Sequence, residues 1–246
     1  MYVKSCRYRH PELGDVHVKV HGSTRHIKAR WIGQEVCVTL PPGCPVDVYE
    51  SFLKSMSTRL LEVRPKPAYT FGQIVDAPLA DFEIVTDDAV RRDVSILPVC
   101  DNAVRGKRIN YRLMFNRRFE DCDMCDASLQ DFINKAVLSA ARHATSALIV
   151  PRARELAASV ERMPLGWDVK EARTRLGCCS SRGIITLSPR LIFLPQELAD
   201  FVIYHELAHL SEMNHSEAFH EICNRYCGGR EAELSRRVRV FKFPVI

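Results

Sequence analysis

The chain has 246 residues, of which 46% are hydrophobic and 26% charged, and a formal net charge of +5. This length supports one large domain or two small ones, and the composition is typical of a soluble globular protein. Repeat, low-complexity and membrane-spanning chains are excluded, because no apolar run approaches the roughly 18 residues that a membrane helix needs. The cationic first residues lack a following apolar segment, which argues against a secretory signal and predicts a cytoplasmic protein.

The basic residues are scattered and favour a solvated basic surface. Nucleic-acid binding would need basic residues interleaved with aromatic ones, and this pattern is missing, so we expect no nucleic-acid partner. A phosphate-bearing substrate is compatible with the charge. The ten cysteines are expected to be reduced and packed as small apolar side chains, because no export signal precedes them.

Strand-like alternation runs through the first 40 residues and predicts strands around 16–20, 27–31 and 36–40. Helical spacing follows from Asp47 to Val63, and Pro65 ends that helix. Short apolar runs predict four further strands, around 69–75, 82–85, 94–99 and 108–115.

The pattern becomes helical near Asp126. Ser128 is the predicted cap of a long helix from Leu129 to Ile149, and Pro151 restarts a helix. A hairpin is predicted around 173–175 and 184–187, and the remainder is predicted to be helical. The sequence thus predicts an α+β fold, with a β-rich region over 1–125 and a helix-rich domain over 126–246.

A His-Glu-x-x-His motif lies in the second half, as His205, Glu206 and His209. Residues four apart lie above one another on a helix, so the two imidazoles can bind one metal ion. Glu206 lies beside the first of them, where its carboxylate can reach a water on that ion. This spacing predicts a zinc site on the helix.

A catalytic zinc needs three protein ligands and an open fourth position. His215 lies ten residues after His205, where Asn214 and Ser216 favour a turn and a new helix start. His220 is the alternative, but it lies inside the predicted helix 216–227 and is better suited to support the site. We therefore predict that Zn²⁺ is bound by His205, His209 and His215.

The predicted zinc ion determines the reaction that this site can catalyse. Zn²⁺ lowers the pKa of a bound water to about 7, so that hydroxide is available at neutral pH. Glu206 is the predicted catalytic base, which takes the proton of this water and passes it to the leaving group. The sequence therefore predicts a zinc-dependent hydrolase.

Three consecutive segments carry a wider resemblance: Arg173-Thr174-Arg175-Leu176-Gly177-Cys178-Cys179-Ser180, then Ile185-Thr186-Leu187-Ser188, then Pro195 through His220. In this order they resemble the YgjP-like metallopeptidase family of zinc hydrolases. The first half resembles the same family through the segments 25–30 and 36–43. The resemblance implies a zincin-like catalytic domain over 126–246, with His205, His209 and His215 as ligands and Glu206 as catalytic residue.

Three positions depart from the family pattern. Leu176 replaces a Trp, Cys178 replaces a Ser, and His220 replaces an aromatic residue after Phe219. These departures imply an altered pocket around an intact metal site. Cys178 or Cys179 as a thiolate ligand would close the fourth position, and we favour the open site.

Three functions remain open. Peptide hydrolysis leads, with the strand 184–187 offering an edge to an extended substrate. The alternative is hydrolysis of a nucleoside triphosphate, for which Arg173 and Arg175 are candidate substrate-binding residues, with Arg182 and Arg190 nearby in sequence. The third is a non-catalytic module that has kept its zinc. The predicted partner is thus a peptide or a nucleotide substrate, and we expect no association with a membrane.

Overall fold

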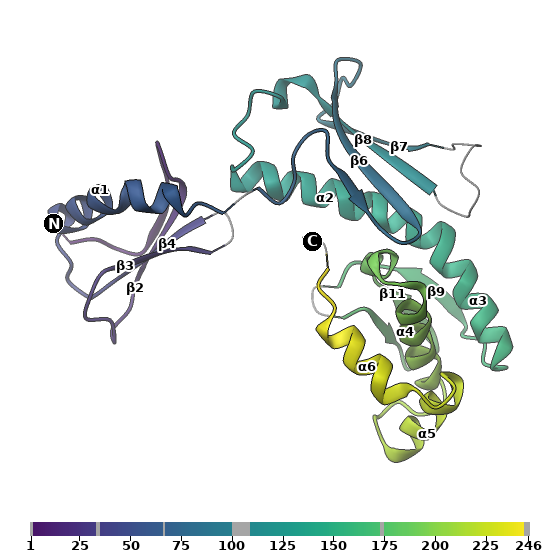
Figure 1. Cartoon of the computed structure of the whole chain (residues 1–246). Coiled ribbons are helices and arrows are strands. Elements are labelled where there is room, and N and C mark those ends of the chain that lie inside the picture. The colour runs from purple at the N-terminus through teal and green to yellow at the C-terminus, as the bar shows by residue number, and fades with distance from the viewer. Residues whose placement is uncertain (1, 33–34, 66, 100–108, 173–174, 244–246) are drawn as a thin grey trace. The chain divides into compact units, whose positions relative to one another are not determined.

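The structure is a computed structural model that describes residues 2–32, 35–65, 67–99, 109–172 and 175–243. The chain forms two compact units, Met1–Thr70 with Glu120–Ile133, and Phe71–Phe119 with Asn134–Ile246. Strands dominate the first part of the chain and helices the last, which confirms the α+β class (Figure 1). The domain boundary between residues 125 and 126 stays a prediction.

The first unit is a four-stranded sheet with helix α1 (Val46–Glu62) on one face (Figure 1). The strands run in the order β1-β2-β4-β3 and have the bounds β1 (Cys6–His10), β2 (Gly14–Val20), β3 (Lys28–Ile32) and β4 (Glu35–Leu40). Strands β2 and β4 are parallel, and the other neighbours are antiparallel. Strand β1 was not predicted, because four of its five residues are exposed and no apolar alternation marks it.

Alternate residues of this sheet form the core under α1. They are fully buried and pack with three residues of the helix: Val16, Val18, Val36, Val38 and Leu40 with Tyr49, Leu53 and Leu60. A period of two places every second side chain on the same face of a sheet. The predicted strands and the predicted helix 47–63 are confirmed.

The second unit contains a sheet in the order β5-β6-β8-β7. Its strands are β5 (Ile74–Asp76), β6 (Ala80–Asp87), β7 (Val94–Val99) and β8 (Ile109–Asn116). The central pair β6 and β8 is parallel and places Phe82, Leu113 and Phe115 in the core with no exposed surface. Three of the four predicted strands are confirmed, whereas most of the predicted strand 69–75 is wrong, since β5 begins at Ile74.

The long helical segment contains α2 (Ala127–Ala144), a π-helical turn (Thr145–Ile149) and α3 (Val150–Ser159) in direct succession. The wide turn precedes Pro151, which has no N–H to donate to the helix. The cap of α2 is not Ser128 as predicted. The Asp126 carboxylate accepts from the backbone N–H of Ser128 at 2.8 Å and of Leu129 at 3.0 Å, so the acceptor stands one residue before the helix begins.

This capping arrangement predicts a difference between two neighbouring substitutions. Asp126→Ala should lower the free energy of unfolding by about 1 kcal/mol, because two N–H groups lose their acceptor. Ser128→Ala should change it by less than about 0.5 kcal/mol. Urea unfolding followed by circular dichroism measures both, and an equal loss for the two variants would contradict the assignment of the cap.

The C-terminal part combines a three-stranded sheet with helices. The strands run β10-β11-β9 and have the bounds β9 (Gly166–Val169), β10 (Gly177–Cys179) and β11 (Ile184–Leu187). The helices are α4 (Gln196–Ala208), α5 (Glu217–Tyr226) and α6 (Glu231–Val240), and short 3₁₀ segments lie at Arg117–Phe119 and Pro189–Phe193.

The predicted hairpin exists, with two corrections. Its first strand is β10 and begins at Gly177 rather than near Arg173, which lies outside the described residues. The prediction that Ile184–Leu187 offers a free edge is wrong, because β11 is paired with β10 on one side and with β9 on the other. The strands at the two edges of this sheet are β10 and β9.

All nine cysteines that the structure describes are free thiols, as expected. The expectation that they are packed is wrong for Cys6, Cys122 and Cys178, which are exposed. Within the described residues, no helix combines the length and the apolar character that a bilayer crossing requires.

Candidate metal centre

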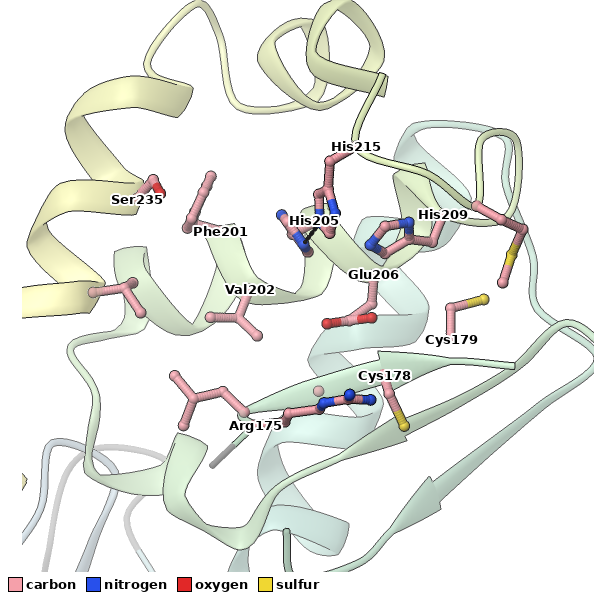
Figure 2. A pocket seen from close by; sticks show the side chains of 14 residues that line it. Arg175, Cys178, Cys179, Phe201, Val202, His205, Glu206, His209, His215 and Ser235 are labelled. Carbon is pink, nitrogen blue, oxygen red and sulfur yellow. Dashed lines mark hydrogen bonds between the residues drawn. The ribbon is translucent and has the colours of Figure 1, made fainter. Parts of the chain in front are cut away.

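Helix α4 presents the His-Glu-x-x-His motif from a buried position. Its first turns are anchored in the core by Leu198, Phe201 and Ile203, each exposed by 5% or less. His205 lies in the last turn, and His209 follows directly as the C-terminal cap residue. The imidazoles of His205 and His209 therefore project from the same side of the helix end (Figure 2).

His215 reaches the same point from the loop that follows. The side-chain donor atoms of His205, His209 and His215 all lie within 4.8 Å of one another. The Nε2 atoms of His205 and His215 are 3.1 Å apart (Figure 2). Two nitrogen ligands of a tetrahedral zinc, each about 2.0–2.1 Å from the ion, are about 3.3 Å apart, so this donor set fits a zinc ion.

Neighbouring groups orient the three rings. The Nδ1–H of His209 donates to the backbone carbonyl of Glu212 at 3.0 Å, which leaves its Nε2 lone pair for a metal. Phe219 is fully buried, and its ring centroid lies 4.9 Å from that of His205, 4.5 Å from that of His209 and 4.8 Å from that of His215. The backbone N–H of Phe219 donates to the Ser216 hydroxyl, the N-cap of α5, at 3.3 Å. The predicted start of a helix at Ser216 is thus confirmed.

The pKa values of two of these histidines are depressed. Burial, reinforced by the neighbouring histidines, lowers the pKa of His205 to about 4. Burial also lowers the pKa of His209, against the opposing effect of its hydrogen bond to Glu212. Both rings are therefore neutral at pH 7, as metal ligation requires.

Glu206 lies directly under the histidine cluster and is only 5% exposed (Figure 2). Burial raises the pKa of its carboxyl to about 7, although Arg175 and the backbone N–H of Cys179 oppose the shift. Its Oε2 atom is buried and has no hydrogen-bond partner among the residues described. A buried acceptor without a donor is costly and is typical of a site that receives a ligand or water.

Strand β10 approaches Glu206 closely at Gly177. A Cβ atom on Gly177 would lie 2.7 Å from Cγ, 2.8 Å from Oε1 and 2.9 Å from Cδ of Glu206. These distances are too short for any side chain to be accommodated without displacing the carboxylate. The glycine therefore allows the strand to lie against the carboxylate.

A pocket of about 580 Å³ surrounds the cluster. Arg175, Cys178 and Cys179 line it, so one of the two predicted substrate-binding arginines lies at the site (Figure 2). Among the residues described, the group suited to a metal comprises the three histidines and neither cysteine, which agrees with an open fourth position. Arg182 and Arg190 do not line this pocket.

His220 lies outside the metal-binding group. Its Nδ1 is 2.6 Å from Oε1 of Glu231, at the start of α6, and its side chain is 54% exposed. The geometry thus favours His215 over His220 as the third ligand. The supporting role suggested for His220 corresponds here to a contact between α5 and α6.

Several pocket residues were not identified from the sequence as part of the site. They are Phe201, Val202, Met213, Ser235 and Val238, together with Gly177 on β10. Leu176, which the sequence places in an altered pocket, also lines it. Phe201 and Val202 lie one turn before His205, so helical spacing could have identified them. Ser235 and Val238 come from α6, and no local signal in the sequence connects that helix with the motif.

The chain matches the family described as YgjP-like, metallopeptidase domain, over residues 100–236, more than half of its 246 residues. No curated protein matches it. The structure of the metallopeptidase zymogen abylysin of Pyrococcus abyssi is 22% identical over 37% of this chain and 91% of that chain, with a TM-score of 0.34. The zymogen of Methanocaldococcus jannaschii jannalysin is 19% identical over 35% of this chain and 89% of that chain, with a TM-score of 0.32.

Proposed function

Because the chain belongs to the YgjP-like metallopeptidase family, we propose that it hydrolyses peptide bonds with a zinc ion bound by His205, His209 and His215. Glu206 is the catalytic base. The observation that carries this proposal is the Oε2 atom of Glu206, which is buried beside the histidine cluster without a hydrogen-bond partner among the described residues. A general base needs such a free acceptor within reach of the water that it deprotonates.

Zinc is the metal that best suits this donor set. Three imidazole ligands with an open fourth position are characteristic of catalytic zinc. When bound, zinc lowers the pKa of water to about 7 and polarises a carbonyl oxygen. The three histidines supply the ligands, and the hydrogen bond from His209 to the Glu212 carbonyl fixes the nitrogen that His209 offers.

Glu206 accepts a proton at Oε2 and returns it to the leaving amine. A pKa of about 7, raised by burial, suits both steps, because the carboxylate binds a proton readily and also releases it at neutral pH. The backbone N–H of Cys179 contributes a hydrogen bond to the carboxyl group. Strand β10 therefore helps to orient the base.

Strand β10 is also suited to position an extended peptide. Hydrogen bonds at both ends of β10 connect it with the β11 side. The N–H of Ser188 donates to the carbonyl of Leu176 at 2.8 Å, and the N–H of Ser180 donates to the carbonyl of Ile184 at 2.9 Å. Antiparallel register then directs the backbone groups of Gly177 and the carbonyl of Cys179 away from β11, while the N–H of Cys179 is bonded to Glu206. A peptide added at this edge passes the metal site, and Arg175 can bind one of its carboxylates.

The close approach at Gly177 gives a prediction of its own. Gly177→Ala should lower the rate of peptide cleavage by roughly 10²-fold, because the added methyl group displaces the Glu206 carboxylate. Bound zinc should be unchanged. The control is Gly166→Ala, since a Cβ there would lie 4.0 Å from the nearest atom, Cγ1 of Ile184, and this variant should retain its rate.

Cleavage rates and zinc content of both variants measure the effect. Full activity of Gly177→Ala would show that the position of the carboxylate does not matter. Loss of zinc from that variant would mean that the strand supports the metal rather than the base.

A substrate panel tests the function itself. Purified protein loaded with zinc is incubated with a denatured protein and, separately, with nucleoside triphosphates. New peptide termini detected by mass spectrometry, abolished by chelation, are the expected result. Release of pyrophosphate or phosphate without peptide cleavage would contradict the peptidase function and indicate a nucleotide hydrolase instead. Absence of turnover with zinc and other divalent metals would favour the non-catalytic module.

A further inference from the structure

The positive charge of the chain is concentrated at its N-terminus. The first 32 residues contain seven Lys or Arg and two Asp or Glu. This excess of five equals the formal net charge of the whole chain, +5, so the other residues are balanced overall. Such asymmetry along a chain indicates a surface for an anionic partner.

The register of the first sheet brings these charges onto one face. Helix α1 covers the face that carries Val16 and Val18, so the alternate residues lie on the opposite face. One row across all four strands consists of Arg7, His17, Cys37 and Arg30. The neighbouring row contains Lys19, Thr39 and Lys28. We call this the basic face, defined by Arg7, His17, Lys19, Lys28 and Arg30.

Three of these cations are available to a partner. Lys19, Lys28 and Arg30 are exposed, and among the described residues none of them forms an ion pair. Arg7 is bound to Glu35, with a distance of 3.2 Å between Nε and Oε1. The segment 120–133 is acidic, but its Asp126 pairs with Arg9, in a row of the sheet that does not contain the three cations.

We propose that the basic face binds the phosphate backbone of a double-stranded nucleic acid. Phosphate recognition depends mainly on charge, whereas a protein partner needs large apolar anchors at the centre of its interface. Among the described residues of this face, Ile32, 48% exposed, is the large apolar side chain that lies open to solvent, and it lies opposite Glu35 rather than among the cations.

A duplex fits this face better than a single strand does. Proteins bind single strands by stacking bases on aromatic side chains, and both Tyr8 and Trp31 lie on the α1 side of the sheet, in register with Val16 and Val36. The sequence predicts no nucleic-acid partner because aromatic residues are not interleaved with the basic ones. Contacts with the phosphate backbone of a duplex do not require aromatic side chains.

Fluorescence anisotropy with a labelled DNA duplex tests this proposal on the full chain. Lys28→Glu combined with Arg30→Glu should weaken binding by at least about tenfold. The slope of log K against log salt concentration should fall in magnitude by about two, because roughly 0.9 is lost for each phosphate contact. An RNA duplex bound with the same sensitivity to these changes would support the same phosphate chemistry.

The matched control is Lys54→Glu with Arg59→Glu, which makes the same change of charge in the same unit but on α1. Both residues are exposed. This variant should bind the duplex within about twofold of wild type. Thermal unfolding followed by circular dichroism verifies that both variants are folded, and single Lys28→Gln and Arg30→Gln variants replace the double variant if it is not.

Three results would overturn the proposal. The wild-type protein does not bind the duplex, both double variants lose binding equally, or an acidic peptide binds this face more tightly than the duplex. A fourth result that would overturn the proposal comes from light scattering. If the chain dimerises and the Lys28 and Arg30 changes abolish the dimer, a second copy occupies the face.

Discussion

Replacing Glu206 by Gln is expected to lower the rate of peptide cleavage by about 10²–10⁴-fold, the usual contribution of a general base. The amide is nearly isosteric with the carboxylate but cannot accept a proton from water at neutral pH. Zinc content should stay the same, because the donor set consists of His205, His209 and His215. Cleavage of a denatured protein and zinc content, measured on the same samples, give both quantities.

The control for this substitution is Glu221→Gln, at an exposed position on α5. It removes the same charge from the same region and should retain the wild-type rate. A Glu206→Gln enzyme with full activity would remove Glu206 from the mechanism. A variant that also lost its zinc would make the rate uninformative, and Glu206→Asp would then separate the position of the carboxylate from its charge.

Replacing His215 by Ala is expected to lower the affinity for zinc by more than about 10²-fold and to abolish cleavage. His215 is the proposed ligand that comes from a loop rather than from α4, and it is exposed, so its loss disturbs the fold least. Competition with a zinc-binding dye measures the affinity. The expected result is a chain that is folded by circular dichroism but does not retain zinc on dialysis.

His220→Ala is the matched control for this experiment. Its side chain is also exposed and lies five residues further along, but it contacts Glu231 instead of the cluster. Zinc affinity should change by less than about threefold. If His220→Ala releases the metal and His215→Ala does not, the third ligand has been assigned to the wrong histidine.

The strands of this chain could be predicted where one of their faces is buried. Val16, Val18 and Val36 alternate with polar residues, and this period marks β2 and β4. Strand β1 lacks that period, since its side chains are largely exposed. The parallel pairing of β2 with β4 had no local signal, because it depends on contacts between segments separated along the chain.

The metal-binding group could be predicted because its geometry is mostly local. His205 and His209 are one helical turn apart, and a short loop returns His215 to them. The roles of Gly177 and Phe219 arise only in the folded chain. There Gly177 lies directly against Glu206, and Phe219 contacts all three imidazoles. Both lie in segments that resemble the family, but no spacing in the sequence indicates these contacts.

The same limit applies to the basic face. In the sequence Arg7, Lys19 and Lys28 are far apart and appear scattered. Three different strands carry them, and the register of the sheet places them on one surface. Charge can be counted from the sequence, but its distribution on the surface follows from strand order.

Anomalous diffraction from crystals grown with zinc, measured above and below the zinc absorption edge, tests the metal site most directly. We expect one peak about 2.0–2.1 Å from the Nε2 atoms of His205, His209 and His215, on the side of the cluster that faces Oε2 of Glu206. A peak bound to Cys178 or His220 in place of His215, or no peak at the three histidines, would contradict this expectation.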